Sequence, residues 1–253
     1  MAKVITVINQ KGGVGKTTTA HAIGAWLQII KCKKVLFIDL DQQGNLTYAT
    51  NASHSKYNSL RILLEGNLVQ GRVQHTESDF YVIPSDPMLA NIDILLTETG
   101  KEYRLKEALE KTSGYQYIVI DTPPSMNVIM INALTASNYA VIPAQADIFS
   151  LQGITQLGNS LDVVKRYTNK ELEVLGIILT RHNPRTILSR DLYKVIEQTA
   201  KKLKTKVFSQ TIRESVIVKE AQATQRDIFS YDMNSNVSQD YNELMQQIWK
   251  EIK

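Results

Sequence analysis

The stretch Lys11-Gly-Gly-Val-Gly-Lys-Thr-Thr, residues 11–18, decides the fold of this 253-residue chain. It directly follows an apolar run at Val4–Ile8, and it opens a segment of helical length. Gly12, Gly13 and Gly15 allow backbone N–H groups to turn inward around phosphate oxygens, where a larger side chain would obstruct them. The helix that follows directs the positive end of its dipole at the same anion. Strand, glycine-rich loop and helix in this order predict a phosphate-binding loop.

The side chains of this loop predict a bound nucleotide with Mg²⁺. Lys16 supplies a positive charge for the β- and γ-phosphates, and Thr17 supplies a hydroxyl for the metal. The usual spacing places a first glycine at position 10, where this chain has Gln10, but the glycines that follow keep the same physical role. The predicted nucleotide-binding residues of the loop are Lys11, Gly12, Gly13, Val14, Gly15, Lys16, Thr17 and Thr18.

Short apolar runs alternate with helix-length segments along the whole chain. None of the runs alternates with polar residues, so we expect strands buried on both faces. The sequence therefore predicts the α/β class, a P-loop fold with a mostly parallel twisted sheet and helices on both faces. A last strand is expected at Val207–Ile212, and residues 1–253 are expected to form a single domain. The expected strands before it are Val4–Ile8, Val35–Asp39, Tyr81–Pro84, Tyr117–Asp121, Ala140–Pro143 and Val174–Leu179.

Carboxylates stand at the ends of two of these runs. Asp39 ends one buried run and is followed closely by Asp41, and Asp121 ends another. The carboxyl ends of parallel strands meet at one edge of an open α/β sheet, where ligands collect. An aspartate at that edge is placed to hold Mg²⁺, usually through water. We therefore expect Asp39, Asp121 and Thr17 at the metal.

Composition bounds the class of protein. Hydrophobic residues make up 43% and charged residues 21% of the chain, which is ordinary for a globular protein. The single cysteine, Cys32, excludes a disulfide framework, a cysteine-based zinc site and an iron–sulfur cluster held by this chain alone. No apolar run approaches the roughly 20 residues that a membrane span needs. We expect a soluble protein of the cytoplasm.

Positive charge is concentrated in the second half of the chain. Residues 1–150 carry 13 Lys or Arg and 13 Asp or Glu, whereas residues 160–226 carry 14 and 7. Such an asymmetry indicates a polyanionic partner for this region, although a solvated basic face would give the same count.

The C-terminal segment, residues 238–253, has the pattern of an amphipathic helix. Its apolar side chains, beginning one residue earlier, recur at steps of three and four. A helix that binds a membrane surface is usually basic on its polar face, whereas the charges of this segment sum to −1. We expect the helix to pack onto the domain, with no membrane partner. The apolar face comprises Val237, Tyr241, Leu244, Ile248 and Ile252.

Several motifs together resemble the ParA/MinD superfamily of P-loop ATPases. Residues 11–18 resemble its deviant Walker A motif, which has an additional lysine early in the loop. Residues 35–45 and 117–124 are similar to its second aspartate motif and its Walker B motif. The resemblance covers nearly the whole chain and is strongest to the ParA/Soj partition ATPases. Further similar stretches are Ile142–Gly153, Glu220-Ala221 and Tyr231–Tyr241.

The resemblance implies ATP, Mg²⁺ and a homodimer that sandwiches two nucleotides. Lys11 would reach the phosphates bound by the partner subunit, and Asp41 would position the attacking water. Asp39 would support the metal and Lys11, and Asp121 would hold Mg²⁺ through water. The expected catalytic residues are Lys11, Lys16 and Asp41, because charge that develops on the γ-phosphate is stabilised once the dimer forms.

The resemblance also implies a DNA-binding, nucleoid-associated protein. The ATP-bound dimer would bind double-stranded DNA without sequence preference, and a ParB-like centromere-binding partner would stimulate hydrolysis and release. The basic excess of residues 160–226 agrees with this, since Lys and Arg suffice for backbone phosphates. Because the sequence opens directly on its first strand, no N-terminal helix-turn-helix domain is expected. The candidate DNA contacts are Arg185, Arg190, Lys201, Lys202, Lys204, Arg213 and Lys219.

Two positions depart from the family pattern. Gln42 replaces a proline in the loop that carries Asp41, which removes a restraint on φ. Arg213 stands where a proline often follows the last strand. Two other functions stay open: a MinD-like, membrane-recruited positioning ATPase, which needs a basic amphipathic tail, and a small-molecule ligase of the same fold, which needs a substrate pocket.

Overall fold

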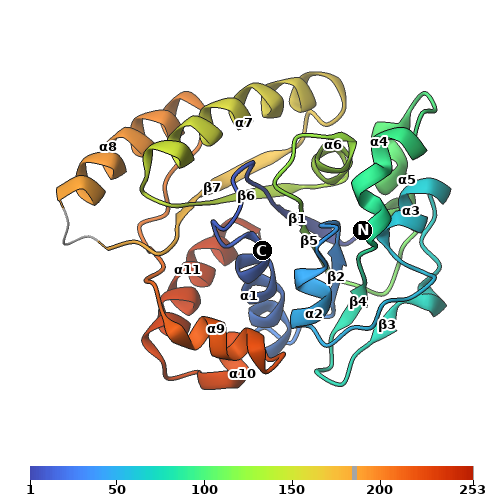
Figure 1. Ribbon diagram of the computed structural model, residues 1–253, viewed down its shortest axis with the longest axis horizontal. Helices are drawn as coiled ribbons and strands as arrows, with labels where there is room; N and C mark the ends of the chain where they lie inside the picture. Colours follow the sequence, from blue (N-terminus) through green and yellow to red (C-terminus); the bar gives the residue numbers. More distant parts are fainter. Residues whose placement is uncertain (184–186, 253) are drawn as a thin grey trace.

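A seven-stranded sheet forms the centre of the protein (Figure 1). The structure is a computed structural model that describes residues 1–183 and 187–252, with only the backbone of 187–190. The strand order is β3-β4-β2-β5-β1-β6-β7, and every neighbouring pair is parallel except β3 with β4. The strands are β1 (Lys3–Val7), β2 (Val35–Asp39), β3 (Gln74–His75), β4 (Tyr81–Ile83), β5 (Tyr117–Asp121), β6 (Tyr139–Ala144) and β7 (Glu173–Leu179).

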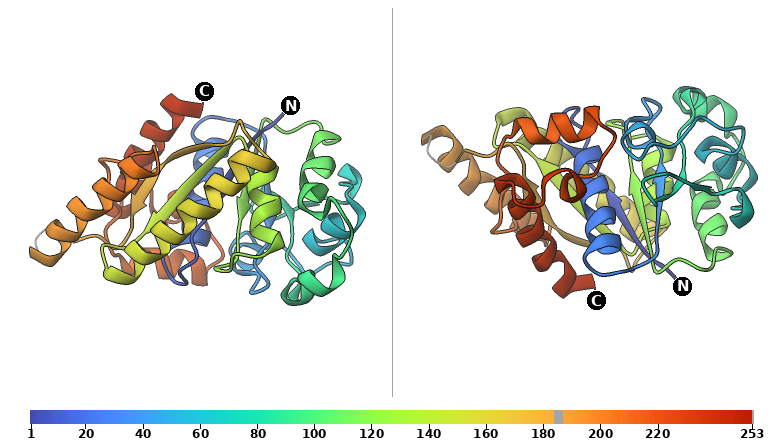
Figure 2. Two further views of the ribbon diagram at one scale, coloured as in Figure 1. Left: turned by 90° about the horizontal axis from the view of Figure 1, so that it is seen from above. Right: turned by 90° about the horizontal axis from the view of Figure 1, so that it is seen from below.

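Helices cover both faces of the sheet, which confirms the predicted class. Figure 2 shows α7 and α8 in front when the molecule is seen from above, and α1, α9 and α11 in front when it is seen from below. Short 3-10 turns lie at Gln70–Arg72, Pro87–Asn91 and Lys101–Tyr103. The helices are α1 (Lys16–Ile29), α2 (Asn45–Ala49), α3 (Ser59–Glu65), α4 (Ile92–Leu95), α5 (Arg104–Glu110), α6 (Val128–Thr135), α7 (Ile148–Tyr167), α8 (Ile187–Lys202), α9 (Val216–Ala223), α10 (Ile228–Asp232) and α11 (Asn236–Ile252).

Strand register brings the predicted carboxylates together. In the pairing of β1 with β5, Val7 lies opposite Asp121, and in the pairing of β2 with β5, Asp39 lies opposite the same Asp121. The loop after β1 therefore leaves the sheet beside both aspartates. A parallel sheet places its strand ends at one edge, and this edge carries the candidate site.

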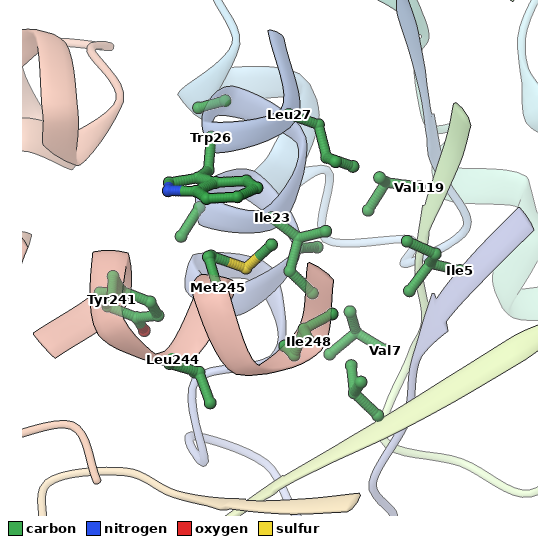
Figure 3. Packing of buried hydrophobic residues seen from close by; sticks show 14 of the residues in the cluster. Ile5, Val7, Ile23, Trp26, Leu27, Val119, Tyr241, Leu244, Met245 and Ile248 are labelled. Carbon is green, nitrogen blue, oxygen red and sulfur yellow. The ribbon is translucent and has the colours of Figure 1, made fainter. Parts of the chain in front are cut away.

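The C-terminal helix α11 packs against α1, as its pattern predicts. Trp26 of α1 donates a hydrogen bond from Nε1 to Asn242 at 2.8 Å. Figure 3 shows Tyr241, Leu244, Met245 and Ile248 of α11 among side chains of α1, β1 and β5. The apolar face of α11 is thus part of the core. Within the described residues, no helix combines the length and the apolar character needed to cross a bilayer. The predicted face residues Val237, Tyr241, Leu244, Ile248 and Ile252 are all buried.

The prediction of a strand at Val207–Ile212 is wrong. Val207 forms only an isolated parallel bridge with Ile177 of β7. Ile212 donates to the Leu179 carbonyl at 2.8 Å, so the segment touches β7 again at its other end. Between these contacts Ser209 and Gln210 form a bend, and a bend interrupts the ladder of hydrogen bonds that a strand requires.

Candidate phosphate-binding site

The loop between β1 and α1 has the backbone that its glycines allow. Gly13 and Gly15 have φ angles of 74° and 88°, in the left-handed region that residues with a Cβ atom avoid. Gly15 is the N-cap of α1 and supplies no side-chain acceptor to the first turn. The unpaired N–H groups of that turn are therefore left for another acceptor, and an anion is the natural one.

Neighbouring strands hold this loop in place. Asn9 donates from Nδ2 to the Pro143 carbonyl at 2.7 Å and accepts from the Lys11 N–H at 2.9 Å. The Thr180 hydroxyl donates to the Val14 carbonyl at 2.8 Å. Asn9 and Thr180 are both buried, so these bonds fix the loop from the β6 and β7 sides. A pre-formed loop binds phosphate without a cost of ordering its backbone.

A cavity of about 550 Å³ lies against the loop. Its size is that of a small-molecule site. Asp41 lines the cavity, and Tyr48 of α2 and Gln222 of α9 contribute to its walls. Val14 is fully buried and takes no part in the lining. The loop residues that line the cavity are Gly12, Gly13, Gly15, Lys16, Thr17 and Thr18.

Lys16 is a buried cation at the base of the cavity. Its side chain is 7% exposed, and Nζ donates to the Lys11 carbonyl at 3.0 Å. Burial lowers the pKa of Lys16, and the charges of Asp121 and Asp41 oppose that shift. A phosphate in the cavity would stabilise the ammonium further, because an opposite charge nearby favours the ionised form.

Asp121 and Thr17 form the arrangement expected at a metal. Thr17 donates from Oγ1 to Asp121 Oδ2 at 2.6 Å. Asp121 is fully buried, and its Oδ1 has no hydrogen-bond partner among the described residues. Burial, and next the charge of Asp39, raises the pKa of Asp121 well above its usual range. A buried carboxylate oxygen without a donor needs a cation or a bound water, which fits a magnesium site.

The rest of the donor set also fits Mg²⁺. No cluster of three His, Cys, Asp or Glu side chains that could hold a metal occurs in the described parts of the chain. Mg²⁺ usually keeps several waters and takes only one or two carboxylates together with substrate phosphates. Thr17 and Asp121 beside a phosphate loop supply that kind of incomplete, oxygen-only site.

Asp39 holds the loop that carries Asp41. Both of its oxygens are occupied: Oδ2 accepts from the N–H and the hydroxyl of Thr47, each at 2.7 Å, and Oδ1 accepts from the Asp41 N–H at 3.1 Å. Burial raises the pKa of Asp39 to about 6, against the effect of these bonds. Ser85 adds a hydrogen bond from its hydroxyl to the Asp41 carbonyl. These contacts restrain the loop at Gln42, where the family has a proline.

Lys11 does not point into the cavity. Its Nζ lies 2.5 Å from Asp147 Oδ2, the residue that caps α7. Lys11 is predicted to act on the phosphates of a partner subunit. In this structure its side chain is instead paired with an aspartate of its own subunit.

The four lysines among the candidate DNA contacts lie in two separate places. We call Lys201, Lys202 and Lys204 the distal lysines; they are exposed at the end of α8. Thr205, next in the chain, donates from its hydroxyl to the Val174 carbonyl at the start of β7. The parallel strands begin at this end of the sheet, and the phosphate loop lies at the other end, where they finish. Lys219 instead lies exposed on α9, whose Gln222 donates to Thr18 at 3.0 Å. The structure therefore does not bring these four described lysines together.

The three arginines among the candidates differ in what the structure shows. Arg213 donates from Nε and Nη2 to the Asp240 carboxylate at 2.7 and 2.8 Å, so its charge is neutralised within the chain. Arg190 belongs to α8, but its side chain is outside the described part, and Arg185 lies outside the described residues altogether. The distal lysines and Lys219 form no ion pair with any described residue.

Sequence reasoning missed several residues that build the site. Asn9 and Thr180 position the phosphate loop through hydrogen bonds to partners 134 and 166 positions away in the chain. Thr47 instead holds Asp39, which lies eight positions before it. A weak signal existed for Asn9 and Thr180, because each polar residue directly follows an apolar run, and a buried polar group must be hydrogen-bonded. Gln222 had no local signal.

The chain matches one family model and is similar to proteins of bacterial chromosome partitioning and sporulation. Residues 2–174 match the model of the family described as AAA domain. The sporulation initiation inhibitor protein Soj of Bacillus subtilis is 38% identical over 253 residues, which cover 98% of either chain. The chromosome partitioning protein ParA of Caulobacter vibrioides is 35% identical and is matched over 97% of this chain and 93% of its own.

Solved structures give the same picture. A putative plasmid partition protein from Borrelia burgdorferi, bound to AMPPNP, is 27% identical with a TM-score of 0.83, and all of both chains is covered. A Mycobacterium smegmatis structure described as cobyrinic acid a,c-diamide synthase with ADP and magnesium is 30% identical with a TM-score of 0.82, covering 100% of this chain and 97% of that one. The phosphate loop and the strand-end aspartates thus occur on a fold that these nucleotide-bound proteins share.

Proposed function

Because the chain belongs to the ParA/Soj family of P-loop partition ATPases, we propose that it binds and hydrolyses ATP to segregate DNA. The observation that carries this proposal is the cavity in which Lys16, Thr17 and Asp41 converge beside the buried Asp121. Residues 1–253 would form one ATPase domain, since a single sheet contains β1 to β7 and α11 returns to pack on α1.

The phosphate loop would hold the triphosphate. The first-turn N–H groups of α1 and the backbone around Gly13 supply donors, and Lys16 supplies the charge. Thr17 and Asp121 would hold Mg²⁺, with Asp121 acting through water. When bound, Mg²⁺ would neutralise charge on the β- and γ-phosphates. The remaining loop residues, Lys11, Gly12, Val14, Gly15 and Thr18, complete the proposed nucleotide-binding set.

Asp41 is the proposed residue for orienting the attacking water. Its carboxylate accepts from the Gln43 N–H at 3.0 Å, which fixes the side chain at the wall of the cavity. Asp39 would support the metal site by holding Thr47 and the Asp41 backbone, because its own oxygens are already used. This division gives one carboxylate for the water and another for the geometry.

A homodimer is the proposed active form, with Lys11 donated to the partner's phosphates. A cation that arrives only on pairing would couple hydrolysis to the assembled state. The dimer would bind double-stranded DNA through backbone phosphates, and pairing doubles the contacts that each chain offers. A ParB-like partner would stimulate hydrolysis and release, in a cytoplasmic protein associated with the nucleoid.

Of the candidate DNA contacts, Lys219 is better placed than the distal lysines. It lies on α9, which contacts the phosphate loop helix through Gln222 and Thr18. The distal lysines lie at the opposite edge of the sheet, near the start of β7. We therefore propose that DNA whose binding depends on nucleotide contacts the protein on the side of α9. The MinD-like alternative receives no support from α11, because its apolar face is used in the core.

Light scattering and DNA retention on the same samples test the proposal. With Mg²⁺ and a non-hydrolysable ATP analogue, we expect a particle of twice the monomer mass. We also expect equal retention of the protein on DNA duplexes of unrelated sequence. With ADP we expect neither result. A monomer that binds no DNA with any nucleotide would contradict the proposal. ATP cleavage only in the presence of a small acceptor molecule would instead indicate a ligase, and ATP-dependent flotation with liposomes would indicate the membrane-recruited alternative.

A further inference from the structure

We propose that Arg181 binds the α-phosphate of the nucleotide and so fastens the nucleoside end of the ligand. The inference rests on the proposed function, because it concerns the same ATP site. Arg181 comes two positions after the end of β7, outside the phosphate loop and both aspartate motifs. Its side chain is exposed and lines the cavity beside the phosphate loop.

Arg181 stands where two hollows of the surface meet. A narrow pocket of about 80 Å³ adjoins the cavity of about 550 Å³. The two share the residues Gly15, Thr18, Arg181 and Gln222 in their walls, and of these four described residues Arg181 is the charged one. We call this shared wall the junction.

The phosphate loop determines which part of a nucleotide reaches the junction. Lys16 and Thr17 are the proposed partners of the β- and γ-phosphates and their Mg²⁺, and Asp41 is the proposed partner of the attacking water. All three line the large cavity and not the narrow pocket. The nucleoside end therefore extends toward the junction, where Thr18 follows Thr17 in the first turn of α1. The phosphate nearest to that end is the α-phosphate.

The backbone holds Arg181 in a strained conformation. Its φ angle is 49°, and of the described non-glycine residues with positive φ it is the one that lines the large cavity. Just before it, the Thr180 N–H donates to the Ala144 carbonyl at 2.8 Å, and just after it, the His182 N–H donates to the Ile212 carbonyl at 3.0 Å. Backbone strain of this kind persists where the surroundings enforce it, and it is frequent at ligand sites.

The guanidinium of Arg181 is available to an anion. Within residues 1–183 and 187–252 it forms no ion pair and no side-chain hydrogen bond. Arg213, which also lines the narrow pocket, is instead paired with Asp240. A guanidinium offers five N–H donors in a planar fork, which matches the oxygens of a phosphate group.

The electrostatics agree with a guanidinium on the side of the narrow pocket. Burial raises the pKa of Tyr241 to about 12, and the charge of Arg181 is one of the influences that oppose this rise. Tyr241 is a buried residue of α11 that lines the narrow pocket and not the large cavity. Arg181 thus acts at the end of the site that Asp41 does not line.

Arg181→Asn removes the charge and suits the backbone, because asparagine adopts the left-handed conformation more readily than most residues. In calorimetry with Mg²⁺, we expect the variant to bind ADP and a non-hydrolysable ATP analogue each about tenfold more weakly than the wild type. Both nucleotides contain the α-phosphate, and the contact that is lost is a charge-assisted hydrogen bond at a partly solvated site.

Two further variants separate the charge at this position from general effects. Arg181→Lys keeps a positive charge and should recover most of the lost affinity. Arg166→Asn makes the same change at an exposed position near the end of α7, and it should leave both affinities unchanged.

Steady-state hydrolysis distinguishes a nucleotide contact from a structural role. Arg181→Asn should keep the wild-type kcat at saturating ATP, while its KM rises about tenfold, because the α-phosphate contact is the same in the ground state and in the transition state. A displaced phosphate loop would lower kcat as well, and that result would overturn the assignment.

The remaining outcomes separate this inference from the proposed function. Wild-type affinity of Arg181→Asn for both nucleotides, a loss confined to the triphosphate, or an Arg181→Lys variant as weak as Arg181→Asn would overturn the α-phosphate contact alone. Weaker retention on DNA at saturating nucleotide, with nucleotide affinity unchanged, would assign Arg181 to DNA instead. Absence of nucleotide binding by the folded wild type would overturn the proposed function itself.

Discussion

Acid should lower the free energy of unfolding of the protein through His21, a buried residue of helix α1, which follows the phosphate loop. His21 is 6% exposed and lies edge-on to Phe37 and Phe80, with ring centroids 5.9 and 5.4 Å away. Its Nε2 has no hydrogen-bond partner among the described residues. Burial lowers the pKa of His21 to about 4, although the charge of Asp227 acts in the opposite direction.

The sign and size of the effect follow from the two pKa values. The pKa of an unfolded histidine is about 6.5, so between pH 6.5 and pH 4 the unfolded chain binds a proton that the folded chain does not. The stabilising contribution is complete above pH 6.5 and is lost as the pH falls. A pH of 5 is about 1.5 units below the pKa of the unfolded histidine. This difference corresponds to a loss of about 2 kcal/mol in the free energy of unfolding.

Urea unfolding of the wild type and His21→Phe at pH 7 and pH 5 measures this contribution. Phenylalanine has a similar shape and no titrating group, so the wild type should lose about 2 kcal/mol relative to the variant between the two pH values. The difference between the proteins is needed because Asp39 acts in the opposite direction. Its pKa of about 6 in the folded state makes protonation stabilising over the same range. A difference that is equal at pH 7 and pH 5 would refute the buried, neutral state of His21.

Three further predictions concern the site and the charged surfaces. Lys16→Ala should reduce ATP affinity at least about 100-fold, since the amine neutralises the phosphates in a partly dry cavity; calorimetry that finds affinity within a few-fold of the wild type would contradict its role. Asp41→Ala should trap an ATP-bound dimer with turnover lowered about 10² to 10⁴-fold, and unchanged phosphate release would move the water-orienting role elsewhere. Lys219→Ala should weaken ATP-dependent DNA binding equally for all sequences and flatten its salt slope by about 0.9 per subunit, whereas replacement of the distal lysines should have the smaller effect; the reverse order would place DNA at the opposite edge of the sheet.

Local patterns were enough to predict the frame of the protein. The strand at Val35–Asp39 and the strand at Tyr117–Asp121 have the predicted bounds, because continuous apolar runs ending in aspartate leave little choice of register. The phosphate loop followed from its glycines. The strand at Val207–Ile212 failed because a bend at Ser209 and Gln210 outweighs the apolar character of its ends.

Long-range contacts set what the sequence could not predict. Lys11 and Asp147 are 136 positions apart, and only the packing of β6 beside β1 brings them into contact. The short antiparallel strand β3 depends on pairing with β4 and has no clear pattern of its own. Likewise, net charge over residues 160–226 could not show that the distal lysines and Lys219 lie at opposite edges of the sheet.

Titration calorimetry of the folded chain with ATP and Mg²⁺ tests the central claim most directly. If the cavity beside Lys16, Thr17 and Asp121 is a nucleotide site, one ATP should bind per chain, and withholding Mg²⁺ should weaken the binding. A correctly folded sample that gives no heat of association at millimolar ATP would contradict the nucleotide site, and with it the dimer and the DNA-binding state that depend on it.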